Sequence, residues 1–216
     1  MRITYVFDLG GVLIQLDVNR CFRAFERLMG EENMRAVLGM DSNGEGVKAV
    51  SVASKQLMAD FERGMISSET FLVQILQYCH PGTTTDDILE AWMSMLDELP
   101  EERLAFVDSL RAKGYPVYLL SNGNDLHYDF INRKYGLENH FDGFFLPQKM
   151  HMAKPEPQIF EAVHAAIGNP ENVIFIDDIQ ANRLAAEQTV HWKTFESIHA
   201  EGFTRSDAKQ ILQLLS

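Results

Sequence analysis

Short apolar runs alternate with longer helix-compatible stretches along most of the chain. Four runs of four or five residues are rich in β-branched and aromatic side chains and show little polar alternation. This pattern is typical of strands that are buried on both faces of a parallel sheet. The runs cover residues 3–7, 117–120, 143–146 and 173–176, and a weaker run over 190–195 predicts a fifth strand.

The stretches between these runs have the length and polarity of surface helices, at 101–113, 125–134, 157–167 and 180–188. A chain that alternates strand and helix in this way forms right-handed βαβ crossovers. The sequence therefore predicts an α/β fold with an open, doubly wound parallel sheet of the Rossmann-like kind.

The interval from about residue 17 to residue 99 has a different character. It contains four helical patterns and no convincing strand, and Ser67 or Ser68 offers a capping start for the third helix. The predicted helices cover 18–29, 47–63, 67–78 and 85–96. We therefore expect a core made of residues 1–16 and 97–216, with residues 17–96 inserted after the first strand as a helical cap.

Composition and charge narrow the classes of function. With 46% hydrophobic and 23% charged residues the chain can bury a sizeable core. The formal net charge of −12, without a cluster of Lys and Arg, disfavours nucleic acid and anionic membranes as partners. Two cysteines do not make a disulfide scaffold, and no signal peptide or run of about 18 apolar residues is found. We expect a cytoplasmic protein, and its oligomeric state, monomer or homodimer, stays open.

Polar residues follow four of the predicted strands. In an open α/β sheet, ligands bind at the carboxyl ends of the strands, so these residues are expected to converge on one edge. They are Asp8 after the first strand, Ser121 and Asn122 after the second, Lys154 in the loop beyond the third, and Asp177 and Asp178 after the fourth.

Together these residues fit phosphoryl transfer, which needs an in-line nucleophile and positive charge around the phosphoryl oxygens. Asp8 can attack phosphorus and form an aspartyl-phosphate. Asp8 and Asp178 can hold Mg²⁺, which prefers oxygen ligands. The residues predicted to bind the phosphate are Gly10, Gly11, Ser121, Asn122 and Lys154.

Each motif has a plainer explanation when taken alone. The Asp177–Asp178 pair could cap the following helix, the Ser-Asn-Gly-Asn segment from Ser121 is a common turn composition, and Lys154 could be a surface lysine. Their succession at four strand ends in a chemically coherent order favours a common site.

The four motifs resemble those of the haloacid dehalogenase-like hydrolases, in the order FDLGGVL, LLSNG, KPEPQIF and FIDD. The resemblance covers the whole chain, and the stretch FERGMISSETF is similar to cap sequences of that family. It is strongest to the sugar-phosphatase-like branch with an Asp-x-Gly first motif, which includes α-D-glucose-1-phosphate phosphatases. The resemblance implies that Asp8, the Gly10 carbonyl and Asp178 bind Mg²⁺, that Asp177 supports the metal through water, and that the substrate is a small phosphorylated metabolite.

One position departs from the family pattern. Most phosphatases of this family carry a second aspartate two residues after the nucleophile as a general acid and base, and here that residue is Gly10. Such a group typically contributes about 10²–10⁴-fold to the rate. We therefore expect a preference for good leaving groups, such as sugar 1-phosphates, aryl phosphates or acyl phosphates. Asp17 is a candidate replacement for the missing acid.

Two other functions share these motifs. A 2-haloacid dehalogenase would use the same nucleophile and the same second motif, but its chemistry has no use for adjacent carboxylates at Asp177 and Asp178. A catalytically degenerate member that binds a phosphorylated ligand or a protein would account for Gly10, but it would not need the nucleophile Asp8.

The seven histidines offer no pair at ligand spacing, so a zinc site is not expected. His127 and His151 lie near the Ser121 and Lys154 motifs. Either could line the pocket, but the sequence favours solvent-exposed loop positions for both.

Overall fold

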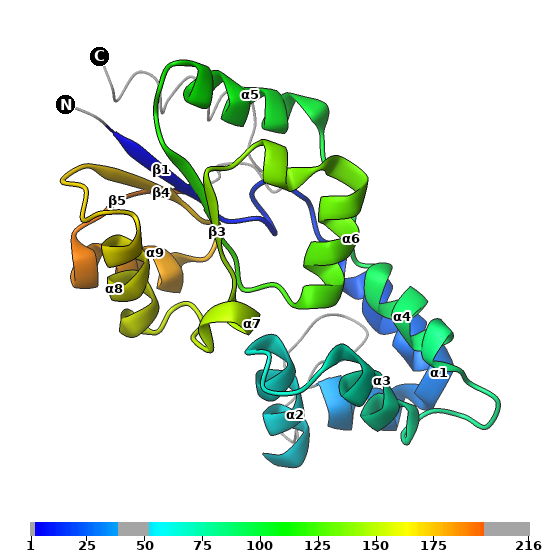
Figure 1. Cartoon of the computed structure of the whole chain (residues 1–216). Coiled ribbons are helices and arrows are strands. Elements are labelled where there is room, and N and C mark those ends of the chain that lie inside the picture. The colour runs from blue at the N-terminus through cyan, green and yellow to red at the C-terminus, as the bar shows by residue number, and fades with distance from the viewer. Residues whose placement is uncertain (1–2, 39–51, 197–216) are drawn as a thin grey trace.

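The computed structural model describes residues 3–38 and 52–196. Five parallel strands form one sheet in the order β3-β2-β1-β4-β5 (Figure 1). They are β1 (Thr4–Phe7), β2 (Val117–Leu120), β3 (Gly143–Phe145), β4 (Val173–Ile176) and β5 (Lys193–Phe195). All five predicted strands are therefore confirmed, although the first two residues of the predicted fifth strand, 190 and 191, lie at the end of a helix instead.

Alternate residues of each strand face opposite layers of helices. Tyr5 and Phe7 join one hydrophobic cluster with apolar residues of α5 (Glu101–Ala112) and α6 (Asp125–Tyr135). Val6 joins a second cluster with residues of α8 (Pro157–Ala166) and α9 (Gln180–Val190). Helices on both faces of a parallel sheet confirm the doubly wound fold. The chain reverses direction of winding at β1, so β1 and β4 border the crevice where such folds bind ligands.

Two short helices were not predicted. They are η1 (Leu137–Asn139) and α7 (Pro147–Met150), which follows β3 directly. Both are a single turn, too short to show a helical period in the sequence. Pro147 at the first position of α7 fixes a backbone angle that suits a helix start.

Four helices between the first two strands pack into a hydrophobic cluster of their own (Figure 1). They are α1 (Val18–Leu38), α2 (Val52–Glu62), α3 (Ser68–Leu76) and α4 (Thr85–Met93). The first residues of the helix predicted over 47–63, residues 47–51, lie outside the described residues. Gly30 has non-helical backbone angles inside α1, so its first segment ends where the 18–29 pattern predicts.

Aromatic side chains form the centre of this cluster. The rings of Phe61 and Phe71 stack with centroids 3.9 Å apart, and Trp92 packs edge-on against both. Ser67 caps α3 by accepting a hydrogen bond from the Thr70 amide at 3.1 Å, which decides between the two serines. The helical character of this region is thus confirmed, and its action as a cap stays a prediction.

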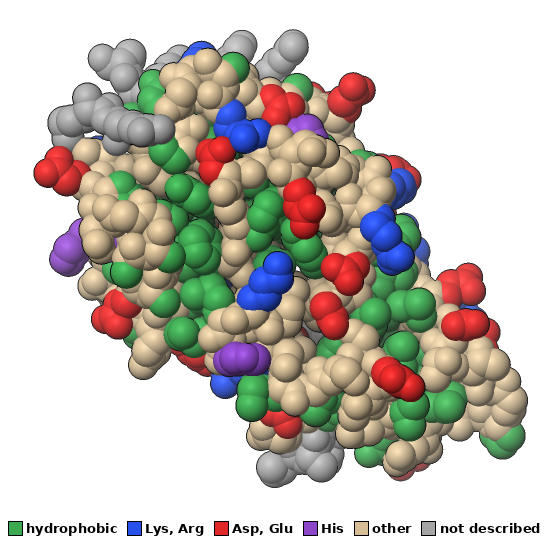
Figure 2. Space-filling model, in the orientation of Figure 1, with side chains coloured by type: hydrophobic (Ala, Val, Ile, Leu, Met, Phe, Trp, Pro, Cys, Tyr) green, Lys and Arg blue, Asp and Glu red, His purple; other side chains and the backbone are tan. Residues whose placement is uncertain are grey.

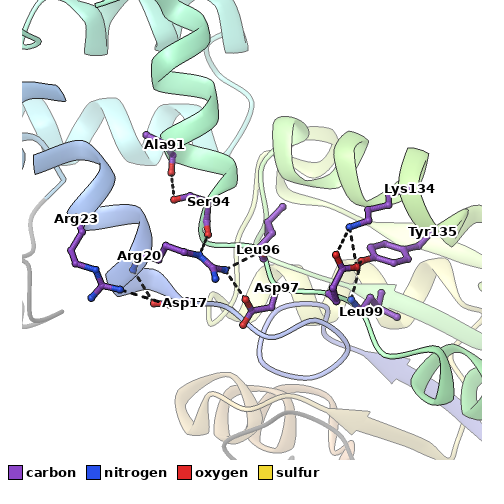
Figure 3. Close-up of polar contacts among 11 residues, drawn as sticks. Asp17, Arg20, Arg23, Ala91, Ser94, Leu96, Asp97, Leu99, Lys134 and Tyr135 are labelled. Carbon is purple, nitrogen blue, oxygen red and sulfur yellow. Dashed lines mark hydrogen bonds and ion pairs between the residues drawn. The ribbon is translucent and has the colours of Figure 1, made fainter. Parts of the chain in front are cut away.

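Two chain segments connect these helices to the sheet, and they pair with each other through backbone hydrogen bonds. The Asp17 amide donates to the Met95 carbonyl at 2.8 Å, and the Asp97 amide donates to the Gln15 carbonyl at 3.1 Å. From α1, the Arg20 guanidinium binds Asp97 at 2.6 Å and also the Ser94 carbonyl (Figure 3). The connection is therefore a short hydrogen-bonded ribbon clamped by one arginine.

No helix within residues 3–38 and 52–196 is long and apolar enough to cross a bilayer. On the face shown in Figure 2, acidic side chains are spread over both parts of the molecule and basic ones stand singly among them.

Phe71→Ala should destabilise the helical cluster by roughly 3–5 kcal/mol, the usual cost of removing a buried phenylalanine. Phe71 is fully buried, whereas Val73 on the same helix is 48% exposed. Val73→Ala should stay within about 0.5 kcal/mol of the parent protein. Urea unfolding followed by circular dichroism measures both, and equal effects would contradict the packing described here.

Candidate active site

Asp8 lies directly after β1, and its carboxylate is buried at the crevice between β1 and β4. Its Oδ1 accepts a hydrogen bond from the Leu9 amide at 2.6 Å. Its Oδ2 lies 3.0 Å from the Nζ of Lys154. The strand therefore holds the Asp8 carboxylate in a fixed position at the carboxyl end of the sheet, as the sequence predicts.

Lys154 is a buried residue rather than a surface lysine. Its ammonium donates to the Leu120 carbonyl at 2.9 Å and to Oδ2 of Asp177 at 2.6 Å, besides its ion pair with Asp8. An ammonium has three donors, and these three partners use all of them. Lys154 thus joins the ends of β1, β2 and β4 at a single nitrogen.

Asp177 is fully buried, and its two oxygens accept four hydrogen bonds from three donor groups. Oδ1 accepts from the Ile179 amide at 2.8 Å and from the Asn182 amide group at 3.0 Å. Oδ2 accepts from Lys154 at 2.6 Å and again from Asn182 at 3.1 Å. A carboxylate offers about four lone-pair sites, so Asp177 has none left for direct metal binding. Ile179 is itself the N-cap residue of α9, and within the described residues this helix has no side-chain cap, so the helix-capping explanation of the Asp177–Asp178 pair does not hold.

Asp178 lies beside the turn that follows Asp8. A Cβ atom at Gly11 would collide with the Asp178 carboxylate, and Gly11 also has a φ of +72°. Both observations require glycine there. The absence of a side chain at Gly11 therefore leaves space for the Asp178 carboxylate. The sequence had instead predicted that Gly11 lies against the phosphate. Ligand oxygens of Asp8, Asp177 and Asp178 all lie within 4.8 Å of one another.

The cluster holds more acidic side chains than basic ones, with three carboxylates around the one ammonium of Lys154. Burial raises the pKa of Asp8 from 3.8 to about 7, with a further contribution from the charge of Asp177, although Lys154 opposes the rise. Burial and Asp177 likewise raise the pKa of Asp178. Burial lowers the pKa of Lys154, but the attraction of Asp8 and Asp177 outweighs it and leaves that pKa raised. Three carboxylates around one ammonium leave an excess of negative charge that a further cation would neutralise. The donor set consists of oxygen atoms alone, which suits Mg²⁺.

The second motif positions the lysine loop. The Asn122 side chain donates to the Lys154 carbonyl at 2.7 Å and accepts from the Lys154 amide at 2.8 Å. Both ends of its amide group thereby hold the backbone of Lys154, so the Asn122 side chain positions the lysine loop. Ser121 is buried beside it, and within the described part of the chain its hydroxyl has no hydrogen-bond partner.

At Gly10 an apolar side chain occupies the place of the missing acid. A Cβ atom at Gly10 would lie 2.8 Å from Cδ1 of Leu16, whose side chain is 37% exposed. Asp17, the suggested replacement acid, caps α1 by accepting from the Arg20 amide at 2.8 Å and lies 3.9 Å from Arg23 (Figure 3). Its contacts are those of a helix cap at the connection, and none of them is to the Asp8 cluster.

The expectation that His127 is a solvent-exposed loop residue is wrong. It lies in the first turn of α6, stacks on Trp92 of α4 with ring centroids 5.5 Å apart, and approaches the Trp92 carbonyl at 3.2 Å. Burial lowers the pKa of His127 to about 4, so the ring is neutral at pH 7. The contact joins residues 35 positions apart, which no local pattern reveals. His151 is exposed, as expected.

Asn182 and Arg183, which hold the Asp177–Asp178 segment in place, were not predicted from the sequence. Besides Asn182, Arg183 donates to the backbone carbonyls of Asp177 and Asp178 at 2.8 and 2.9 Å. Both belong to the first turn of α9, where a polar residue in the sequence predicts an ordinary solvent-exposed position on the helix. The signal that could have found Asn182 is its spacing of four residues from the apolar Ala186, which places it on the buried face.

Comparison with known proteins decides the family. A family model for haloacid dehalogenase-like hydrolases matches residues 4–188. The chain belongs to this family. Among curated relatives of this hydrolase, D-ribitol-5-phosphate phosphatase from Bacteroides thetaiotaomicron is 26% identical over 184 residues, which is 82% of this chain and 83% of that protein.

Solved structures agree with this assignment to the haloacid dehalogenase-like hydrolases. A HAD family enzyme from Bacteroides thetaiotaomicron in complex with magnesium and inorganic phosphate matches with a TM-score of 0.74 and 30% identity, over 91% of this chain and 94% of that one. A HAD-like family hydrolase from Porphyromonas gingivalis matches with a TM-score of 0.78 and 28% identity, over 100% and 98% of the two chains.

Asp8→Asn should raise the free energy of unfolding of the metal-free protein, and more at pH 8 than at pH 5. Because folding raises the pKa of Asp8 from 3.8 to about 7, the stability that its neutral form contributes is present below about pH 4 and is lost as the pH rises through 7. Removing the charge should therefore gain roughly 1–3 kcal/mol at pH 8. Urea unfolding in EDTA measures this gain.

The matched control is Asp129→Asn, because Asp129 is exposed on α6. It should change stability equally little at both pH values. An equal gain for Asp8→Asn at pH 5 and pH 8 would contradict the buried-charge account.

Proposed function

We propose that this hydrolase is a Mg²⁺-dependent phosphatase that acts on a small sugar phosphate through an aspartyl-phosphate on Asp8. The observation that carries the proposal is the buried cluster of Asp8, Lys154 and Asp177 with Asp178 beside it at the sheet edge. A phosphatase relative and a structural relative solved with magnesium and inorganic phosphate support it.

In the proposed first step, a carboxylate oxygen of Asp8 attacks phosphorus and the bond to the leaving oxygen breaks, and that oxygen takes a proton from solvent. Water then attacks the aspartyl-phosphate, which releases phosphate and restores the carboxylate. The Ser121 hydroxyl would donate to a phosphoryl oxygen, and the charge of the Lys154 ammonium beside Asp8 would stabilise the phosphoryl oxygens electrostatically.

The ammonium of Lys154 also fixes the direction of attack, because it holds Oδ2 of Asp8 while the Leu9 amide holds Oδ1. Asp177 and Asn182 keep the ammonium in place. When bound at Asp8, Asp178 and the Gly10 carbonyl, Mg²⁺ would supply positive charge to the phosphoryl oxygens.

We also propose that residues 17–96 act as a cap over this site. Support comes from the separate hydrophobic cluster of α1–α4 and from the paired connections at 15–17 and 95–97. A cap that excludes water and bulky ligands favours small soluble metabolites as substrates. The cytoplasmic location stays a prediction, and the oligomeric state, monomer or homodimer, stays open.

Asp8→Asn should abolish turnover of phosphomonoesters, because a carboxamide is not a nucleophile toward phosphorus. Asp178→Asn should lower activity and raise the Mg²⁺ concentration needed for half-maximal rate, since a ligand charge is lost. Asp129→Asn is again the control and should keep full activity. Release of inorganic phosphate with and without EDTA measures all three, and activity of Asp8→Asn or activity that survives EDTA would refute the proposal.

The leaving group should decide the rate, because Gly10 provides no acid and Leu16 lines that position with apolar atoms. Comparison of p-nitrophenyl phosphate, glucose 1-phosphate and D-ribitol 5-phosphate tests this. The value of kcat/KM, which reports formation of the aspartyl-phosphate, should fall as the pKa of the departing hydroxyl rises. A rate on ribitol 5-phosphate as fast as on the other two would show that another group protonates the leaving oxygen.

A further inference from the structure

The turn between α2 and α3 touches the core at the segment that carries Lys154. This turn contains Arg63 and Gly64, and the core segment runs from α7 at Pro147 to Glu156. The end of α2 lies beside α7 in Figure 1, and the two helices are in contact. Three separate contacts join the turn to this segment.

The first contact is a close backbone approach. A Cβ atom at Gly64 would lie 2.7 Å from Cα and 2.8 Å from the carbonyl oxygen of Gln148. Backbone atoms of a helix cannot move aside as the tip of a side chain can. Gly64 also has a φ of +66°, which favours glycine independently. Only glycine therefore allows this approach.

The other two contacts come from Arg63. Its carbonyl accepts a hydrogen bond from Nδ1 of His151 at 2.9 Å. Its guanidinium forms an ion pair with Glu156, two residues after Lys154. Glu156 in turn accepts from the Ala153 amide at 3.4 Å, on the other side of the lysine. The contacts from Arg63 thus bracket the loop that holds Lys154.

We propose that the Arg63–Gly64 turn is a latch through which closure of the cap positions the Lys154 ammonium for phosphoryl transfer. Arg63, Gly64 and Glu156 are then positioning residues, and their catalytic effect rests on the proposed function. A displacement of about 1 Å at a catalytic group can lower the rate about 10²-fold. The Arg63 and Glu156 side chains are 41% and 36% exposed, and exposed ion pairs are weak, so the latch can open for exchange of substrate and product.

The test compares Gly64→Ala with Gly82→Ala in the full-length protein. Gly82 lies in the same group of helices with a φ of +93°, but nothing lies within 4 Å of its missing Cβ. Both alanines bear left-handed backbone strain, and only the one at residue 64 meets the core. Deuterium exchange of the amides of residues 147–156 and kcat and KM on p-nitrophenyl phosphate with Mg²⁺ are measured for each.

The latch predicts faster exchange over 147–156 in Gly64→Ala and a kcat lowered at least 10-fold, with KM changed less. Gly82→Ala should match the parent protein in both measurements. Equal exchange and equal kcat in the two variants would overturn the proposal. If the parent protein hydrolyses no phosphomonoester, the proposed function fails, and the exchange measurement still decides whether the turn holds the loop.

Charge exchange keeps the test valid if Gly64→Ala does not fold. Arg63→Glu and Glu156→Arg should each speed exchange over 147–156 and lower kcat, because each places like charges together. The double variant Arg63→Glu/Glu156→Arg should recover at least half of both losses. Losses in the double variant that equal the sum of the single ones would contradict a direct contact.

Discussion

A buried ammonium between two buried carboxylates is the interaction on which the rest of the site depends. Lys154 binds Asp8 at 3.0 Å and Asp177 at 2.6 Å, and no water-exposed surface of its side chain remains. Buried charges are tolerated only when they are paired and hydrogen-bonded. With Asp178 alongside, the carboxylates outnumber the ammonium. Burial, and to a smaller extent the charge of Asp177, raises the pKa of Asp8. A site that folds with surplus negative charge is prepared for a cation.

The surrounding structure holds that ammonium in place. Asn122 binds both backbone groups of Lys154, and Asn182 binds both oxygens of Asp177. The sheet places the ends of β1, β2 and β4 side by side, so residues that are far apart in the sequence meet at one nitrogen. The contacts of the Arg63–Gly64 turn extend this support to the helices outside the sheet. The buried charge of Asp8 lowers the free energy of unfolding, and the hydrogen bonds around Lys154 and Asp177 limit this loss.

The sequence could predict the strands and the residues at their ends, because buried parallel strands leave long apolar runs and the loops after them must carry polar chemistry. The sequence also predicts Lys154 as a site residue, although it lies well beyond β3, because it belongs to the loop region that follows this strand. The hydrogen bonds of Asn182 to Asp177 and the stacking of His127 on Trp92 could not be predicted, because they depend on which helix faces meet in space. The capping contacts of Asp17 and the space taken by Leu16 at Gly10 likewise arise only once the chain is folded.

The central claim is that Asp8 receives the phosphoryl group beside a cation that Asp178 helps to hold. A crystal structure with Mg²⁺ and beryllium fluoride tests it directly, since the fluoride complex mimics a phosphoryl group on a carboxylate. The account predicts beryllium bonded to an oxygen of Asp8, Mg²⁺ coordinated by Asp8 and Asp178, and Asp177 still bound to Lys154 and Asn182. Beryllium fluoride absent from Asp8, or Mg²⁺ held directly by Asp177 in place of its hydrogen bonds, would contradict the account.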